Sequence, residues 1–427
     1  MRSELEKKEF NMQDRPREKF FSVGIAAALF IFGIIAILTS VTPMAFTTGG
    51  KWFTPPCDFS LRMAEVDCLR RGVDPYQVWK GNVVLPPFRP NYGSKIDNPE
   101  CTVDINAYVP WVYTIMLPFS YLHAKIAWAG YFAMMMGAWL FIPWILRKST
   151  SSDKLAGISG LLLVSYPVWS NLCIGNLSIF VLLAVILMGY FLNKGNDTIA
   201  GCCWAIAMIK PQLGLIFAIP LLMRRKWKTC FVAGLICLSL SIPPALMCNT
   251  SPLTMILQAP SANTFMFHGC GTWPYALCGY IGGNGDVLAS LAVGAIICWV
   301  LTRQISFKSD WIVFLMPAAV CGMSWTYASS YGHVLAWFFF YALVSELIHS
   351  PRDGRLWLLL AISLISTTRL YLFYHGFSVA FPGSSAAIAI PDNAHWHIDS
   401  INSCVDMVLC ILLCKWIRQT SRSRLEV

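Results

Sequence analysis

The residues best suited to chemistry in this sequence are four carboxylates in the segment from Cys57 to Trp79. In chain order they are Asp58, Glu65, Asp67 and Asp74. A carboxylate held beside an apolar layer loses hydration, which raises its pKa toward the range where a general base works at neutral pH. Such a group could accept the proton of an acceptor hydroxyl. Asp58 also has a structural interpretation, since it follows two prolines and a cysteine and could cap a helix.

Two basic residues stand inside runs that are otherwise apolar. Lys210 lies next to Pro211, and Arg369 lies among threonines and tyrosines. Ionisable residues in apolar spans are rare and are candidates for function by default, and a guanidinium is suited to bidentate capture of a lipid phosphate. The alternative for either side chain is that it extends to the membrane surface, and Arg369 could also form an ion pair.

Histidines provide a second candidate base. His333 follows a Ser-Ser-Tyr-Gly run where two apolar segments meet, and imidazole has the right ordinary pKa to abstract a proton near neutrality. It could equally be a histidine satisfied by hydrogen bonds. His395 and His397 are two residues apart and could bind a divalent cation together. A metal site needs more ligands than these two histidines supply. We therefore predict no metal and no cofactor. The sequence also lacks nucleotide-binding and zinc-protease motifs.

The framework that must position these residues is predicted to be membrane-embedded. Of the 427 residues, 56% are apolar and only 13% are charged, which exceeds the apolar content of soluble chains. The net charge of +10 does not indicate nucleic acid, because excess Lys and Arg in a membrane protein usually lie in cytoplasmic loops. The composition predicts an all-α polytopic membrane protein.

Apolar runs of about 20 residues, the length that crosses a bilayer, recur along the chain. We predict spans at 20–41, 125–146, 156–173, 177–193, 229–247, 287–302, 311–329, 333–348, 356–374 and 401–417. Prolines interrupt two further segments, 106–122 and 198–222. Counting those, we expect about 10 to 12 transmembrane or re-entrant helices in one integral membrane domain, residues 1–427.

Basic clusters fix the expected orientation of the spans. They fall at alternate ends, and all can be cytoplasmic if 106–122 does not complete a crossing and 198–222 enters and leaves on one side. Pro211 divides 198–222 into halves too short to cross alone, so we predict a re-entrant hairpin there. The long loops 42–106, 248–286 and 375–400 then lie outside the cytoplasm.

The first of these loops is expected to carry a short amphipathic helix on the membrane surface. Its apolar face would be Phe59, Met63 and Val66, and its charged face Asp58, Arg62 and Glu65. Asp74-Pro75 is expected to end the helix, because a proline disfavours helical dihedrals in the residue before it. The charged face would then be presented along one side of the helix.

In its motifs the sequence resembles the GT-C superfamily of glycosyltransferases, and within it glycosyltransferase family 87, the polyprenyl-phosphate-mannose-dependent enzymes. The matching motifs, in the family's order over most of residues 50–340, are Asp58-Phe59, Gly72-Val73-Asp74-Pro75-Tyr76, Ile174-Gly175-Asn176-Leu177, Ala200-Gly201, Ile209-Lys210-Pro211, Arg224-Arg225-Lys226-Trp227 and Ser329 to Trp337. The chain departs from the family at two places. Asn176 stands where glutamine is usual, and His333 is single where a histidine pair is common.

The resemblance implies a GT-C membrane enzyme that moves a hexose, mannose or glucose, from a polyprenyl-phosphate donor. The acceptor would be a hydroxyl of a lipid-linked or cell-envelope glycan, and the anomeric carbon would be inverted. The reaction would take place on the extracytoplasmic face, which suits the bacterial inner membrane. Membrane lipids are expected partners and nucleic acid is not.

Residue roles follow from the resemblance together with the residues themselves. Asp58 and His333 are the candidate bases: the superfamily favours the aspartate, and the family-specific element favours the histidine. Arginines would hold the lipid phosphate, and aromatic rings would stack on the sugar or form an interfacial belt. The predicted substrate-binding residues are Arg62, Glu65, Arg70, Arg71, Asp74, Tyr76, Lys210, Tyr331 and Arg369.

Two other functions share the span count and the intramembrane charges. A flippase or transporter for lipid-linked sugars would more often show paired halves related by a repeat, and the sequence shows no repeat. A glycan polymerase or ligase of the outer leaflet would tend to place its main catalytic loop late in the chain. Here the charged segment lies early, between the first spans.

Overall fold

The computed structural model describes residues 57–79, 108–149, 171–172, 175–267, 284–324, 330–350, 352–368 and 392–423. Within these ranges all regular structure is helical, which confirms the predicted all-α class for this part of the chain. The predicted span 20–41, most of 156–173, most of the loops 42–106 and 375–400, and residues 268–283 of the loop 248–286 lie outside the described residues.

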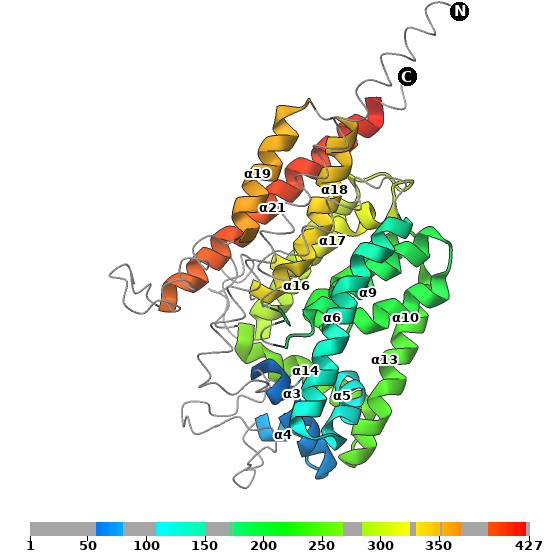
Figure 1. Cartoon of the computed structure of the whole chain (residues 1–427), viewed down its shortest axis with the longest axis vertical. Helices are drawn as coiled ribbons and strands as arrows, with labels where there is room; N and C mark the ends of the chain where they lie inside the picture. The colour runs from blue at the N-terminus through cyan, green and yellow to red at the C-terminus, as the bar shows by residue number, and fades with distance from the viewer. Residues whose placement is uncertain are drawn as a thin grey trace, which may run out of the picture.

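The helices are named by their positions in chain order. They are α3 (Cys57–Arg70), α4 (Pro75–Trp79), α5 (Pro110–Met116), η1 (Leu117–Tyr121), α6 (Ala124–Ser149), α9 (Ser178–Asn193), α10 (Asp197–Ala207), α11 (Pro211–Gly214), η3 (Leu215–Phe217), α12 (Ala218–Met223), α13 (Trp227–Met247), α14 (Pro252–Phe267), α16 (Asn284–Thr302), α17 (Trp311–Ser324), η4 (Ser330–Leu335), α18 (Ala336–His349), α19 (Gly354–Thr368) and α21 (Asp392–Ser423). Figure 1 shows α16 and α17 between the α6–α9–α10–α13 group and the group of α18, α19 and α21.

Two of the described helices are long and apolar enough to cross a membrane. They cover Ala124–Ile145 in α6 and Trp227–Met247 in α13. Each buries one face and exposes large apolar side chains on another, including Leu140 on α6 and Phe231 on α13. Shorter apolar helices occur at several of the other predicted spans.

The helix α3 differs from the expected surface helix. Its apolar residues Phe59, Met63 and Val66 are fully buried, but Arg62 and Glu65 are buried as well, at 5% and 0% exposure. The charged face is covered because α3 packs against α5, η1 and α13. This face of the helix therefore lies within the protein, and Arg62 and Glu65 pair with each other.

The end of α3 also differs from the expected one. The helix stops at Arg70, and Gly72 adopts φ +72°, a left-handed conformation that favours glycine. The amide of Val73 then donates to the carbonyl oxygen of Cys68 at 2.9 Å, which closes the helix terminus. Gly72 thus ends α3 before the Asp74-Pro75 pair is reached, and Pro75 begins α4.

The segment around Lys210 is a broken helix. α10 ends at Ala207, Lys210 has the non-helical dihedrals φ −122° and ψ 87°, and α11 starts at Pro211. A residue before proline is pushed out of the helical region, which explains the break. The indole nitrogen of Trp204 donates to the carbonyl oxygen of Gly214 at 2.9 Å, so the two halves are fastened to each other.

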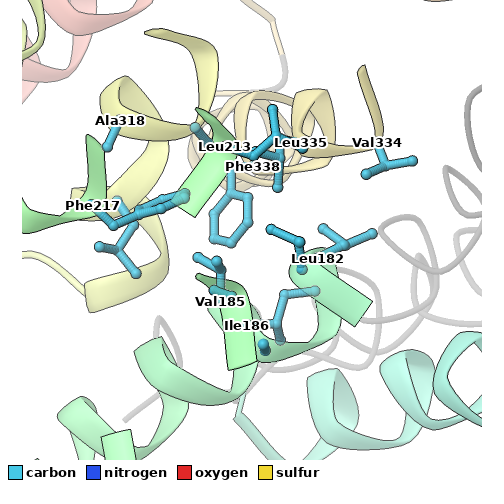
Figure 2. Packing of buried hydrophobic residues seen from close by; sticks show 14 of the residues in the cluster. Leu182, Val185, Ile186, Leu213, Phe217, Ala318, Val334, Leu335 and Phe338 are labelled. Carbon is cyan, nitrogen blue, oxygen red and sulfur yellow. The ribbon is translucent and has the colours of Figure 1, made fainter. Parts of the chain in front are cut away.

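The apolar core holds this broken segment against α9. Figure 2 shows Phe338 of α18 pointing toward Val185 of α9, with Leu213 and Phe217 of the broken segment beside it. α9 also contacts α6, α10 and α17. The polar residues at its start, Asn176 and Ser178, are buried. That start is where the polar cluster lies.

Candidate active site

The first turn of α3 meets the start of α9 through a hydrogen bond between side chains. The amide nitrogen Nδ2 of Asn176 donates to Oδ2 of Asp58 at 2.5 Å. Asn176 lies just before α9, and its backbone amide donates to the carbonyl oxygen of Asn171 at 3.0 Å. Gly175 before it has φ +73°, a conformation that glycine adopts without strain. The tight turn aims Asn176 at Asp58.

Lys210 reaches the same point from the helix break. Its ammonium nitrogen Nζ is 2.6 Å from Oδ1 of Asn176 and 3.0 Å from Oγ of Ser178. All three side chains are buried, with exposures of 1% or less. The non-helical backbone at Lys210 turns its side chain toward α9. The structure therefore brings Asp58, Asn176, Ser178 and Lys210 into one polar cluster.

An ion pair on α3 adjoins this cluster. Nη1 of Arg62 lies 2.7 Å from Oε2 of Glu65, and the guanidinium stacks 3.9 Å from the centre of the Tyr108 ring. The second oxygen of Glu65, Oε1, is buried and has no hydrogen-bond partner among the described residues. Burial raises the pKa of Glu65 to about 8; the positive charge of Arg62 opposes this rise, and nearby Asp58 adds to it.

Aromatic side chains support the buried part of α3. Phe59 packs against Trp128 and Tyr131 of α6, at ring-centroid distances of 5.3 and 5.0 Å. Tyr76 is fully buried, packs against Tyr113 and donates from its hydroxyl to the carbonyl oxygen of Tyr108. The ring of Tyr76 therefore helps to hold the site together, and its predicted stacking on a sugar stays a prediction.

Asp74 takes part in the turn that leads into α4. Its Oδ1 accepts a hydrogen bond from the backbone amide of Tyr76 at 2.9 Å. This is the local side-chain bond expected of aspartate in a turn. The contact explains the position of Asp74 in structural terms, and its predicted contact with substrate is untested.

Arg70 and Arg71 lie at the far end of α3. Asp58 is about 18 Å away along the helix axis, at 1.5 Å per residue. Arg70 donates to the carbonyl oxygen of Ser120 at 2.8 Å, and Arg71 pairs with Asp67 at 2.9 Å. The structure thus does not bring these two arginines together with Asp58, in contrast to Arg62.

His333 lies in η4, which packs against α9 and α17. It is 3% exposed, and its Nδ1 is 3.5 Å from Oδ2 of Asp406 on α21. Its role as a base stays a prediction. The side chain of Tyr331 and the whole of Arg369 lie outside the described residues.

Asn176 and Ser178 lie in the polar cluster but were not among the site residues predicted from the sequence. The signal that could have identified them is a pair of polar residues immediately before an apolar run, in the same motif region as Gly175. Among the described residues, no group of three or more His, Cys, Asp or Glu side chains could hold a metal ion. The side chains of His395 and His397 are outside that part.

Comparison with known proteins gives one match. The family model described as glycosyltransferase family 87 matches residues 106–321, just over half of the chain. This range contains Asn176, Ser178 and Lys210, whereas Asp58 precedes it and His333 follows it. No curated protein and no solved structure matches the chain.

Proposed function

Because the chain belongs to glycosyltransferase family 87, we propose that it transfers a hexose from a polyprenyl-phosphate donor to a lipid-linked or cell-envelope glycan. The family makes the protein a glycosyltransferase. The identities of the donor, the acceptor and the sugar, and the side of the membrane on which the reaction occurs, are what we propose. In a bacterium the reaction would occur on the periplasmic side of the inner membrane.

The observation that carries the proposal is the position of Asp58. It is partly exposed at the start of α3, while the groups behind it, Asn176, Lys210 and Arg62, are buried. A carboxylate in this position could take the proton from an acceptor hydroxyl. The hydroxyl oxygen would then attack the anomeric carbon as its bond to the phosphate oxygen breaks. The lipid phosphate leaves with the bonding electrons, and inversion results.

Buried cations would favour the charge that builds on the departing phosphate. Arg62 is the arginine nearest to Asp58 among those that the sequence suggested and the structure describes. Arg369 remains a proposed ligand of the phosphate. No metal ion is needed in this scheme, because guanidinium groups supply the positive charge.

The contacts of α13 support the proposed sidedness. At its start, Lys226 pairs with Asp197 at 2.9 Å, and nearby Arg224 donates to the carbonyl oxygen of Ser309 at 2.9 Å. At its other end, the carbonyl oxygen of Met247 lies beside Gly72, at the end of α3. The 21 residues of α13 span about 30 Å. The basic loops and α3 are therefore at opposite ends of a helix long enough to cross a bilayer.

The Lys226–Asp197 pair also supports a re-entrant hairpin. Asp197 begins α10, and Lys226 follows α12, so the two ends of the broken segment meet. Such backbone is tolerated at membrane depth where it is buried in protein, and Lys210 at the break is 1% exposed. We propose a GT-C type polytopic architecture on this basis.

An apolar hollow suits the tail of a polyprenyl donor. It has a volume of about 550 Å³ and lies between α12 and α16. Its lining residues are Ile219, Leu222, Met223, Ala295, Ile296 and Trp299. A long isoprenoid chain is apolar throughout and would lie along this surface without burying polar groups.

The proposal is tested by replacing Asp58 in protein reconstituted into lipid nanodiscs. We expect Asp58→Asn to lower the rate of hexose transfer from polyprenyl-phosphate mannose or glucose by about 100-fold or more, the usual contribution of a general base. His333→Ala tests the other candidate base, whose Nδ1 is 3.5 Å from Oδ2 of Asp406 on α21. Product formation is followed with a labelled sugar.

Asp67→Asn is the matched control on the same helix. Asp67 pairs with Arg71 near the far end of α3, so the variant should transfer at the wild-type rate. Full turnover by Asp58→Asn would refute the assignment of the base. Movement of intact donor across the bilayer without cleavage of the sugar–phosphate bond would instead support a transporter.

A further inference from the structure

Three hydrogen bonds converge on the side-chain oxygen of Asn176. Oδ1 accepts from Nζ of Lys210 at 2.6 Å, from the backbone amide of Ser178 at 3.0 Å and from Oγ of Ser178 at 2.8 Å. An amide oxygen can only accept hydrogen bonds, and an amide nitrogen can only donate them. The three donors therefore determine which end of the amide is which.

The orientation of this amide determines that Asp58 accepts a hydrogen bond from Asn176. With its oxygen held toward Lys210 and Ser178, Asn176 directs Nδ2 at the carboxylate, 2.5 Å away. A rotated amide would set its oxygen against the carboxylate and its NH₂ group against an ammonium. That arrangement loses the bonds of Asn176 to Asp58, to Lys210 and to the backbone amide of Ser178, at a buried position where unpaired polar groups are costly.

We propose that Lys210 is a positioning residue that acts through Asn176 to orient the carboxylate of Asp58, without contacting the substrate. This inference rests on the proposed function, in which Asp58 is the base. It replaces the expectation that Lys210 binds substrate. Its basis is that the ammonium group is buried and makes hydrogen bonds to Asn176 and Ser178.

Among the described residues, other charged and titratable groups also interact with Asp58. Arg62 and Glu65 lie on α3 itself, and Tyr131 comes from α6. Arg62 pairs with Glu65; burial raises the pKa of Glu65 to about 8, so below that pH Arg62 is the charged member of the pair. Lys210 interacts with Asp58 from the helix break. A donor aimed at a carboxylate favours its ionised form.

The test measures the ionisation of Asp58 without requiring turnover. An apolar carbodiimide modifies protonated carboxyl groups, and mass spectrometry reports the labelling of the peptide that contains Asp58 as a function of pH. We expect Lys210→Met to move the midpoint of labelling to higher pH by about one unit, as for loss of a neighbouring positive charge. Asn176→Leu should move it in the same direction.

Lys226→Met is the matched control. It removes a lysine from the same broken segment, but Lys226 pairs with Asp197 at the opposite end of α10. Its labelling midpoint should equal that of the wild type. Lys210→Arg keeps the positive charge, so its labelling midpoint should lie between that of Lys210→Met and that of the wild type.

The kinetics separate positioning from substrate binding. If Lys210 positions Asp58, Lys210→Met moves the acidic limb of the kcat profile to higher pH and leaves KM for the donor within about 3-fold, because uniform substrate binding is unchanged. A large rise in KM with an unmoved labelling midpoint would overturn the inference. So would wild-type midpoints in both Lys210→Met and Asn176→Leu.

The two proposals fail in different ways. A wild-type protein that transfers no hexose from polyprenyl-phosphate donors refutes the proposed function, while the labelling experiment still decides whether Lys210 acts on Asp58. If Lys210→Met does not give a monodisperse protein, Asn176→Leu decides the question, since it removes the connecting amide and leaves the lysine in place.

Discussion

At the scale of single residues, Glu65 is the most unusual group in the described part of the protein. It is fully buried, one oxygen pairs with Arg62 and the other has no hydrogen-bond partner among the described residues. Its pKa is raised by burial to about 8. The unfolded chain releases this proton near the ordinary value of 4.5, whereas the folded protein holds it to higher pH.

This difference has a defined sign for stability. Below pH 4.5 both states bind the proton, and between pH 4.5 and about 8 only the folded state does. The contribution of Glu65 to stability is therefore full at low pH and is lost as the pH rises through about 8. The slope in that window is at most about 1.4 kcal/mol per pH unit.

Glu65→Gln should remove this dependence. The neutral amide resembles protonated Glu65, so we expect the variant to match the wild type near pH 5 and to lose less stability than the wild type between pH 5 and 8. Thermal unfolding in detergent at several pH values measures the difference. Asp67→Asn, at a partly exposed position on the same helix, should keep the wild-type slope. Equal slopes for Glu65→Gln and wild type would contradict the assignment.

At the scale of elements, the broken segment from α10 to α12 depends on a close backbone approach. A Cβ atom added at Gly214 would lie 2.5 Å from the carbonyl oxygen of Ala207. The obstacle is main chain, so it cannot move aside as a flexible side chain could. The fold of α11 back onto the end of α10 therefore requires glycine at this position, and Lys210 lies in the turn between them.

Gly214→Ala should consequently destabilise the protein by about 2 kcal/mol, the usual cost of overpacking. It should also reduce transfer activity, because the turn that places Lys210 is displaced. Gly234→Ala is the control: nothing lies within 4 Å of a Cβ there, in the middle of α13. Alanine at that position should be neutral or stabilise the helix by up to about 1 kcal/mol. Unfolding midpoints that rank the two variants in the opposite order would refute this account.

At the scale of the whole molecule, basic residues from distant helices gather at one end. Arg224 donates to the carbonyl oxygen of Ser309, and Arg418 donates to the side chain of Gln304. Asn193 at the end of α9 pairs with Asp310 in the same region. Since cytoplasmic loops are enriched in Lys and Arg, this end is the proposed cytoplasmic side, and α3 lies toward the other.

Cysteine labelling in whole cells tests this orientation. In a background without other reactive cysteines, Arg71→Cys should react with a membrane-impermeant maleimide added outside. Lys308→Cys should react only after permeabilisation. Both positions are exposed, so access to reagent decides the result. Labelling of Arg71→Cys solely after permeabilisation would place α3 in the cytoplasm and remove the argument for a lipid-borne donor.

The helical class, the helix break at Lys210 and the family could be predicted from residues that are close together in the sequence. The helical class follows from long apolar runs, and the break at Lys210-Pro211 follows from the steric effect of proline on the residue before it. Family membership was also recognisable, because short motifs such as Gly175-Asn176 occur in the family's order, and the family match confirms it. Lys210 was recognisable as a candidate functional residue because it is a single ionisable group in an apolar run.

The partners of those groups were decided only by tertiary structure. Asp58 and Asn176 are 118 residues apart, and no local pattern indicates that they meet. The packing of α3 against α5, η1 and α13 buried Arg62 and Glu65, although their spacing alone predicted an exposed charged face. The sequence by itself determined which residues carry charge and that the helix breaks before Pro211, because these depend on neighbours along the chain. The packing of distant helices determined which charges meet, because burial and pairing depend on neighbours in space.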